Sequence, residues 1–404
     1  MPTPVFVCGL ECGSLDAIHF SKQGTADFNT SIVDTGLRSC RTNPTAAQGT
    51  FESSFVSFSS TVGVARQRLY IASAPIASGV VLGFGVASIT YMAGLAYNIL
   101  DSKWYAAFDN GTTVTMGATG VTIATGSWVT IDVRVNVVAN PWLVDVSVGT
   151  TSLGQASVAV AASTTDRYAF GTRVRAVNTF DLYHDNLTVS LTSADYPLSV
   201  GKLTAFSPTR DGTHTSTGTN FVIGQAGGSL TVTSTAVYTL LDDVPLAVNT
   251  SDFVNQQTSA PLTYVEVGFA TASGAPMGVE LIVGAHSLTT AQGNMKFKWN
   301  DGGTTVAFWN RASSGSSALA INRAHYASKP TGGAWTLAAF DALLLRGGYS
   351  TDANPDQFWD CAMMEVAFPA SAAGISVLAS GLGSLTVPVN STGWYHQSYI
   401  SGLV

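Results

Sequence analysis

The stretch WVTIDVRVNVVANPWLVDVSVG, residues 128–149, decides the fold class. Apolar and polar residues alternate through most of residues 128–138, which is the period of a strand with one buried face. A second alternating run begins at Trp142, and Asn140-Pro141 separates the two runs as a turn. The stretch therefore predicts an antiparallel β-hairpin.

Two further turns indicate the same organisation. Asn110-Gly111 lies inside KWYAAFDNGTTVTMG (residues 103–117), and Asp301-Gly302-Gly303 lies inside NMKFKWNDGGTTVAFWN (residues 294–310). Asn, Asp and Gly tolerate the positive φ that tight hairpin turns require. TYVEVGFAT (residues 263–271) and GVELIVGAHSL (residues 278–288) add runs with strand patterning. We therefore predict an all-β chain built from antiparallel sandwiches of jelly-roll type.

One segment has helical rather than strand periodicity. In AWTLAAFDALLLRGG, residues 334–348, apolar residues recur three and four positions apart, and Gly347 supplies a stop signal. We predict a helix here, as the exception in a chain of strands.

The composition leaves the surface with little charge. Charged residues make up 11% of the 404 residues, against roughly 25% in a typical soluble protein. Uncharged polar residues or neighbouring chains must cover the surface, and the second alternative is typical of a permanent oligomer. Residues 69–100 and 366–404 contain no Asp, Glu, Lys or Arg. Because Ser, Gly and Pro interrupt both stretches, we expect a hairpin of buried strands in the first, not a membrane span.

The charge balance excludes some partners. The net charge is −7, and the 18 basic residues are spread thinly along the chain. Such a distribution forms no basic stripe for phosphates, so nucleic acid is not an expected partner. The start, MPTPVFVCGL, has neither a basic region nor a long apolar region, so we expect no secretory signal.

The order of the expected elements repeats loosely along the chain. The two most similar internal segments are WYAAFDNGTTV (residues 104–114) and FKWNDGGTTVAFW (residues 297–309). We predict one sandwich over residues 1–198, a second over residues 199–368, and an uncharged C-terminal arm over residues 369–404. FDLYHDNLTVSLTSADYPL, residues 180–198, is then the closing strand and exit of the first sandwich.

Cysteine and histidine residues are scattered rather than clustered. Zinc sites need paired ligands at close spacing, which the cysteines do not offer. A disulfide from Cys8 or Cys12 to Cys40 and free buried thiols are the two alternative states of these cysteines. The histidines lie beside no GxSxG motif. We predict no metal site, no cofactor and no nucleophile motif among these residues, which are Cys8, Cys12, Cys40, Cys361, His19, His184, His214, His286, His325 and His396.

The acidic and aromatic residues leave two sugar-related alternatives. Glycoside hydrolysis needs two facing carboxylates, but Glu11, Glu52, Glu266, Glu280 and Glu365 are isolated and no ExDxE triplet occurs. Glu266 is the best candidate for a groove, and a solvent-facing strand position is its alternative. Tryptophan side chains could form a sugar platform or pack in the cores. The candidates for that platform are Trp104, Trp142, Trp299, Trp309 and Trp359.

Two sets of segments resemble known families. The first half resembles a LamG-like, concanavalin A-like jelly roll. The likeness rests on three segments: GSWVTIDVRVNV (residues 126–137), the strand after Asn110-Gly111, and FDLYHDNLTVS (residues 180–190), which contains the acidic pair Asp181 and Asp185. The later segments resemble two-domain virion proteins of tailed bacteriophages. These segments are YPLSVGKLTAFSPTRDGTHTSTG (residues 196–218), LLDDVPL (residues 240–246) and GGYSTDANPDQFWDCAMMEVAF (residues 347–368).

The resemblance implies a structural role. It predicts a non-enzymatic virion protein, at the tail tip or fibre, which assembles in the bacterial host cytoplasm as a homo-oligomer with other virion proteins. The alternatives are a capsid decoration protein and a carbohydrate-binding module for host-surface glycans. LamG-like domains sometimes bind calcium at the rim, for which Asp242-Asp243 and Asp181 with Asp185 are the candidate ligands, while capping of turns is the alternative.

Overall fold

The structure is a computed structural model, and the all-β prediction is confirmed. Two antiparallel β-sandwiches follow one another along the chain, with few and short helical segments among the described residues. None of those segments is long and apolar enough to cross a membrane. The described residues are 4–11, 20–24, 26–44, 49–53, 60–86, 90–171, 179–201, 203–214, 221–223, 230–231, 237–242, 253–256, 262–287, 294–311, 319–350, 357–370, 376–377 and 385–386.

The first sandwich contains two large antiparallel sheets. Sheet A has the order β13 (Thr151–Val158), β12 (Trp142–Val148), β11 (Trp128–Asn136), β6 (Val62–Ser73), β15 (Asp181–Ser190), β4 (Ser39–Thr42) and β3 (Ala26–Asn29), and β1 (Phe6–Cys8) also pairs with β15. Sheet B has the order β10 (Val114–Met116), β9 (Lys103–Asp109), β8 (Tyr91–Asn98), β7 (Gly79–Val86), β14 (Thr165–Gly171), β5 (Gly49–Ser53) and β2 (Phe20–Gly24).

The predicted hairpins of the first sandwich are present. β11 pairs with β12 across the Asn140-Pro141 turn, and β9 pairs with β10 across Asn110-Gly111. Gly111 has a φ of 84°, the positive value that such a turn requires. β7 and β8 pair within the uncharged stretch, and every residue of β7 is buried. That stretch is therefore a pair of buried strands.

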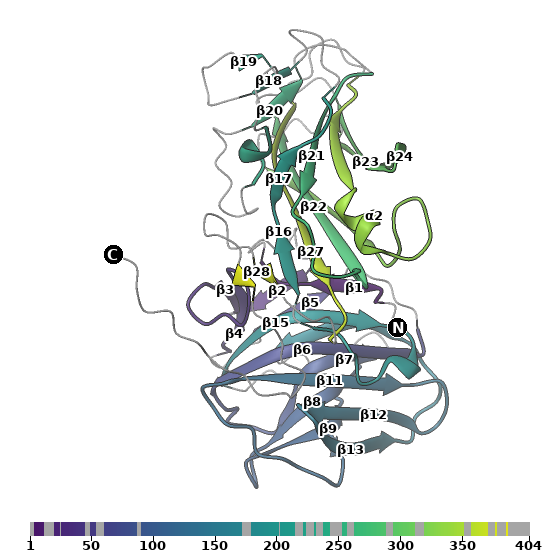
Figure 1. The fold of residues 1–404 in the computed structure, drawn as a ribbon. Coiled ribbons are helices and arrows are strands. Elements are labelled where there is room, and N and C mark those ends of the chain that lie inside the picture. The colour runs from purple at the N-terminus through teal and green to yellow at the C-terminus, as the bar shows by residue number, and fades with distance from the viewer. Residues whose placement is uncertain are drawn as a thin grey trace.

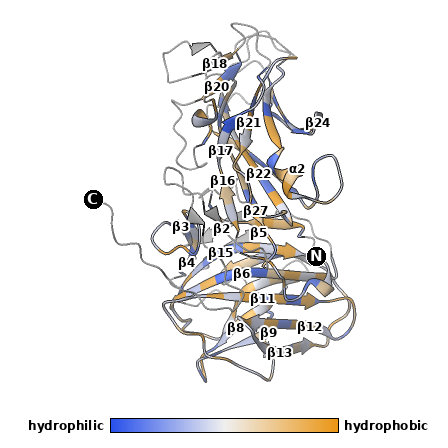
Figure 2. Cartoon of the chain, in the orientation of Figure 1, coloured by the Kyte–Doolittle hydropathy of each residue, from blue (hydrophilic) through white to orange (hydrophobic). Residues whose placement is uncertain are grey.

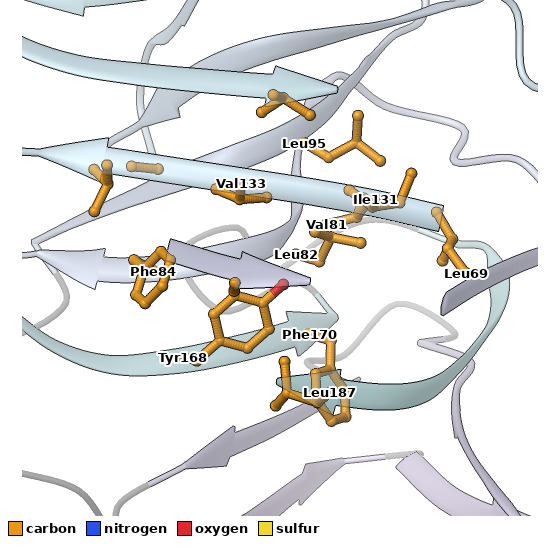
Figure 3. Packing of buried hydrophobic residues seen from close by; sticks show 14 of the residues in the cluster. Leu69, Val81, Leu82, Phe84, Leu95, Ile131, Val133, Tyr168, Phe170 and Leu187 are labelled. Atoms are coloured by element: carbon orange, nitrogen blue, oxygen red, sulfur yellow. The ribbon is translucent and has the colours of Figure 1, made fainter. Parts of the chain in front are cut away.

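The core of the first sandwich lies between sheets A and B. Leu69, Ile131 and Val133 of sheet A meet Leu82 and Phe84 of sheet B (Figure 3). Burying each such side chain contributes about 1.5–3 kcal/mol through the hydrophobic effect. The alternation along β6 and β11 places these apolar residues inside, so the residues between them form the outer face of sheet A.

The second sandwich repeats the architecture with shorter strands. Sheet C has the order β19 (Leu230–Thr231), β18 (Phe221–Ile223), β20 (Val254–Gln256), β27 (Gln357–Ala367), β22 (Gly278–Ser287) and β25 (Ala320–Tyr326), and β16 (Thr204–Phe206) also pairs with β27. Sheet D has the order β17 (Pro208–Asp211), β21 (Tyr264–Phe269), β26 (Leu344–Gly348), β23 (Met295–Asp301) and β24 (Thr304–Arg311). Among the described connections, η1 (Ser193–Asp195) and η3 (Val237–Leu240) are short 3₁₀ segments.

The helix prediction for residues 334–348 is wrong over most of its length. The α-helix α2 covers only Leu337–Asp341, capped by the Thr336 hydroxyl, which accepts from the backbone N–H of Ala339. The next residues form β26, which lies between β21 and β23 in sheet D. Leu345 points from β26 into the core. The apolar spacing is therefore satisfied by a central strand, whose hydrogen bonds to two neighbours outweigh a local helical preference.

The two sandwiches are stacked, and the strands of the second run crosswise to those of the first (Figure 1). The connection between them is paired with the end of β27, because the N–H of Gly201 donates to the carbonyl of Phe368. Leu198 and Val200 of this connection pack against Val64 of β6 and Ala367 of β27. Of the predicted C-terminal arm, the structure describes Pro369, Ala370 and a pair of two-residue strands, β28 (Ser376–Val377) with β29 (Leu385–Thr386), and the rest of the arm lies outside the described residues.

Candidate functional site

Four of the five candidate tryptophans are core residues. Trp104, Trp142, Trp299 and Trp359 are each at most 2% exposed, so they offer no sugar platform. Trp309 of β24 is half-buried and stacks on Phe297, with 5.2 Å between ring centroids. The packing alternative therefore holds for the four buried residues.

Glu266 faces neither a groove nor solvent. The side chain is 1% exposed, and its Oε1 accepts from Arg346 Nε at 2.6 Å and from Asn300 Nδ2 at 2.8 Å. Its Oε2 accepts from the backbone N–H of Thr213 at 2.8 Å. Both oxygens of this buried carboxylate therefore accept hydrogen bonds from the protein itself.

Asp181 and Asp185, one pair of candidate calcium ligands, have separate partners. Asp181 binds Arg41 in a bidentate ion pair, whereas Asp185 accepts from the backbone N–H groups of Asp34 and Thr35. Asp242 is described but Asp243 is not. Over the described ranges, His, Cys, Asp and Glu form no group that could hold a metal ion.

The histidines and cysteines have structural surroundings where they are described. His184 lies in the core of the first sandwich, hydrogen-bonded to Thr42 and Gln67, and burial lowers the pKa of its imidazole to about 3. Cys8, Cys40 and Cys361 are buried and form no disulfide, so the alternative of a bridge from Cys8 to Cys40 is wrong. Cys12, His19 and His396 lie outside the described residues.

The outer face of sheet A gathers charged side chains in ion pairs. Hydrophilic segments lie along β6 (Figure 2). Four arginine–aspartate pairs lie on it with N···O distances of 2.8–3.0 Å: Arg41–Asp181, Arg66–Asp132, Arg68–Asp34 and Arg134–Asp145. Each arginine has one aspartate partner, so the four pairs carry no net charge.

An aromatic row crosses the same face. Trp128, Tyr70 and Tyr183 occupy directly opposed positions on β11, β6 and β15, and Arg41 of β4 continues the row. The ring centroids of Trp128 and Tyr70 are 5.6 Å apart, and those of Tyr70 and Tyr183 are 5.8 Å apart. We call these four residues the aromatic row. Sequence reasoning missed it, although the outward positions of two alternating strands carry the signal.

A second cluster of charges lies where the two sandwiches meet. Arg323 of β25 donates from Nε to Glu280 Oε1 at 2.7 Å and lies 3.7 Å from Glu365 Oε2. It also donates from Nη2 to the carbonyl of Val7 in β1 at 3.4 Å. The backbone N–H of Glu11 donates to Glu365 Oε1 at 3.2 Å. We call Glu11, Glu280, Arg323 and Glu365 the junction cluster.

The junction cluster is buried and contains more acids than bases. Burial raises the pKa of Glu365, against the opposing effect of Arg323. Burial also raises the pKa of Glu11 well above its usual value. For Glu280, burial pushes the pKa upward, but Arg323 and His325 outweigh this effect and leave the pKa below its usual value. Burial therefore raises the pKa of Glu11 and Glu365, while Arg323 and His325 lower that of Glu280.

No protein-family model matches the chain, and no curated protein matches it in sequence. Among solved structures, the chain is similar to a Trypanosoma rangeli sialidase in complex with sialic acid, at 14% identity and a TM-score of 0.31, over 47% of this chain and 33% of the sialidase chain. This chain therefore spans about a third of the length of that sialidase.

Two further solved structures are similar at the same low level. One is the N-terminal tandem CBM22 domain of Paenibacillus barcinonensis Xyn10C, at 11% identity and a TM-score of 0.26, over 90% of this chain and 98% of that chain. The other is a protein of unknown function from Shewanella oneidensis MR-1, at 12% identity and a TM-score of 0.26, over 43% of this chain and 79% of that chain. These matches place the chain in no family.

Proposed function

We propose that the chain is a non-enzymatic structural protein of a bacteriophage virion, positioned at the tail tip or fibre. It assembles into a homo-oligomer through the faces of its sandwiches and the segment 369–404. The segments at residues 196–218, 240–246 and 347–368 support this proposal through their resemblance to two-domain virion proteins. The low share of charged residues supports it as well, because permanent oligomers bury apolar surface between subunits.

The observation that carries the proposal is the junction cluster. A structural protein that holds two parts of a particle at a fixed distance and orientation needs domains that do not move relative to one another. Arg323 of the second sandwich contacts β1 and is 4% exposed. Ile282 and Met363, on the same face of sheet C as Glu280 and Glu365, belong to the core of the first sandwich. The stacked sandwiches then behave as one rigid unit.

The surroundings of the carboxylates support a role without catalysis. Glu266 and Glu280 are each bound to a buried or half-buried arginine, and each of the four arginines on the outer face of sheet A is paired with one aspartate. A general acid or base must instead reach a substrate. These six carboxylates are each held by an arginine of the sheets or the junction.

The test is the mass in solution of the full chain and of a chain that stops at Phe368, measured by light scattering. We expect the full chain to form a defined oligomer and the shortened chain to be a monomer, because the removed segment supplies the contact between subunits. Two well-behaved monomers would contradict assembly through this segment. The alternative role as a capsid decoration protein predicts antibody labelling over the head of the particle rather than at the tail tip.

A further inference from the structure

We propose that the aromatic row of sheet A is a binding site for a neutral pyranose unit of a glycan. This site is a function beyond the structural role and is independent of the C-terminal segment. The row lies on the half-buried outer face of sheet A, away from the core that occupies the other side. Trp128 and Tyr70 are each partly accessible to solvent.

The geometry of the row suits a sugar ring. Pyranose rings have an apolar face of C–H groups, which packs on aromatic rings, and a rim of hydroxyl groups. Trp128 and Tyr70 are tilted by 53° to each other, so they form two walls rather than one flat surface. Tyr and Trp combine an apolar ring with a polar group, and buried examples usually hydrogen-bond that group. In the described part of the chain neither the indole N–H of Trp128 nor the hydroxyl of Tyr70 has a protein partner.

Fixed polar groups flank the two rings. On one side Arg41 binds Asp181 through Nε and Nη2, at 2.8 and 2.9 Å. On the neighbouring row, Arg68 binds Asp34 and donates from Nη1 to Thr130 Oγ1 at 2.8 Å. A carboxylate oxygen has two lone pairs, so these pairs hold their positions and still accept from a ligand. Donors and acceptors held beside an aromatic surface match the hydroxyl rim of a sugar.

The charges select a neutral ligand. Arg41 and Arg68 are each neutralised by an aspartate partner, and Asp27, opposite Arg41 on β3, is exposed. Burial also raises the pKa of Asp185, opposite Arg68, well above its usual value, which favours the uncharged carboxyl. An anionic glycan or a phosphate needs unpaired cations. The row offers none, so a neutral hexose is the ligand class that fits.

The experiment is affinity electrophoresis of the full chain in native gels that contain dextran, mannan or galactan, with polysialic acid and heparin as anionic polymers. We expect at least one neutral polymer to retard the protein. We expect Trp128→Ala to weaken the affinity for that polymer at least tenfold, and Tyr70→Phe to weaken it less because the ring remains. Trp309→Ala is the matched control, since it removes a half-buried tryptophan of the second sandwich, and we expect wild-type retardation.

Several results would overturn this site. They are no retardation by any of the neutral polymers, retardation by the anionic polymers alone, and equal affinities of wild type and Trp128→Ala. Thermal unfolding of each variant separates lost binding from lost folding, and Tyr70→Phe keeps the proposal testable if Trp128→Ala unfolds. A lower mass of Tyr70→Phe in light scattering, without a change in retardation, would assign the row to a contact between copies of the chain. That outcome leaves the proposed structural role intact.

Discussion

The outer face of sheet A and the junction cluster use charged residues in opposite ways. On sheet A, each arginine meets one aspartate in a partly accessible pair, as for Arg134 and Asp145, whose side chains are 30% and 17% exposed. At the junction, Arg323 meets two glutamates, and Arg323, Glu280 and Glu365 are all buried. Accessible pairs contribute little to stability, whereas a buried charge without its partner is costly. The first region can therefore present a surface, while the second fixes two domains together.

The largest expected effect is the loss of the junction arginine. Arg323→Met leaves Glu280 buried without its main partner, so we expect the free energy of unfolding to fall by about 3–5 kcal/mol. Arg134→Met is the matched control on sheet A, with an expected loss of about 0–1 kcal/mol. Chemical denaturation measures both variants. Equal losses in the two would remove the distinction between the regions.

A second effect concerns the neutral histidine inside the first sandwich. The pKa of His184 is lowered by burial to about 3 from an ordinary value near 6.5, so the unfolded chain binds a proton that the folded chain does not. The stability that this difference contributes is complete above pH 6.5 and is lost as the pH falls toward 3. Within this range, the free energy of unfolding falls by about 1.4 kcal/mol for each pH unit. Between pH 6 and pH 4, the wild type should therefore lose about 2 kcal/mol more than His184→Gln.

Denaturation curves at several pH values measure this difference in slope. The absolute stability of His184→Gln will be lower at every pH, because the stack of His184 on Phe170 is lost. Only the pH dependence tests the prediction. Parallel pH profiles of the two proteins would mean that His184 titrates normally in the folded chain.

The smallest expected effect concerns the pH dependence of stability at the junction. Its direction is opposite to that of His184, because the stability falls as the pH rises. The pKa of Glu365 is raised by burial, and Arg323 opposes that rise. A raised carboxyl pKa stabilises the fold fully below the unfolded value of about 4.3 and loses this contribution as the pH rises through the folded value. Glu365→Gln carries no titrating proton, so we expect the melting temperature of the wild type to fall more steeply between pH 5 and pH 8. Asp181→Asn on sheet A is the control for a partly exposed carboxylate. A wild-type profile no steeper than that of Glu365→Gln would contradict the assignment.

The sequence by itself determined the strands and most of their turns. The alternation at residues 128–138 predicts β11, and Asn110-Gly111 and Asp301-Gly302-Gly303 mark hairpins that are present in the structure. These signals are local, because side-chain alternation and positive φ depend on adjacent residues only. Residues 334–348 show where local signals fail: Leu337, Phe340 and Leu344 are three and four positions apart, as on one face of a helix, whereas Leu343 and Leu345 are two positions apart, as on one face of a strand. The neighbouring strands of sheet D decide between the two.

Only the tertiary structure decided which polar residues meet. Trp128, Tyr70 and Tyr183 come from three distant segments, and strand register alone places them in one row. Glu280 and Glu365 are directly opposed on β22 and β27, but their alternation with apolar residues predicts a solvent-facing side. The first sandwich covers that side and turns the two acids into buried groups that need Arg323. Register and domain contacts are long-range properties, so sequence patterns fix the elements, while the fold fixes the candidate site and the junction.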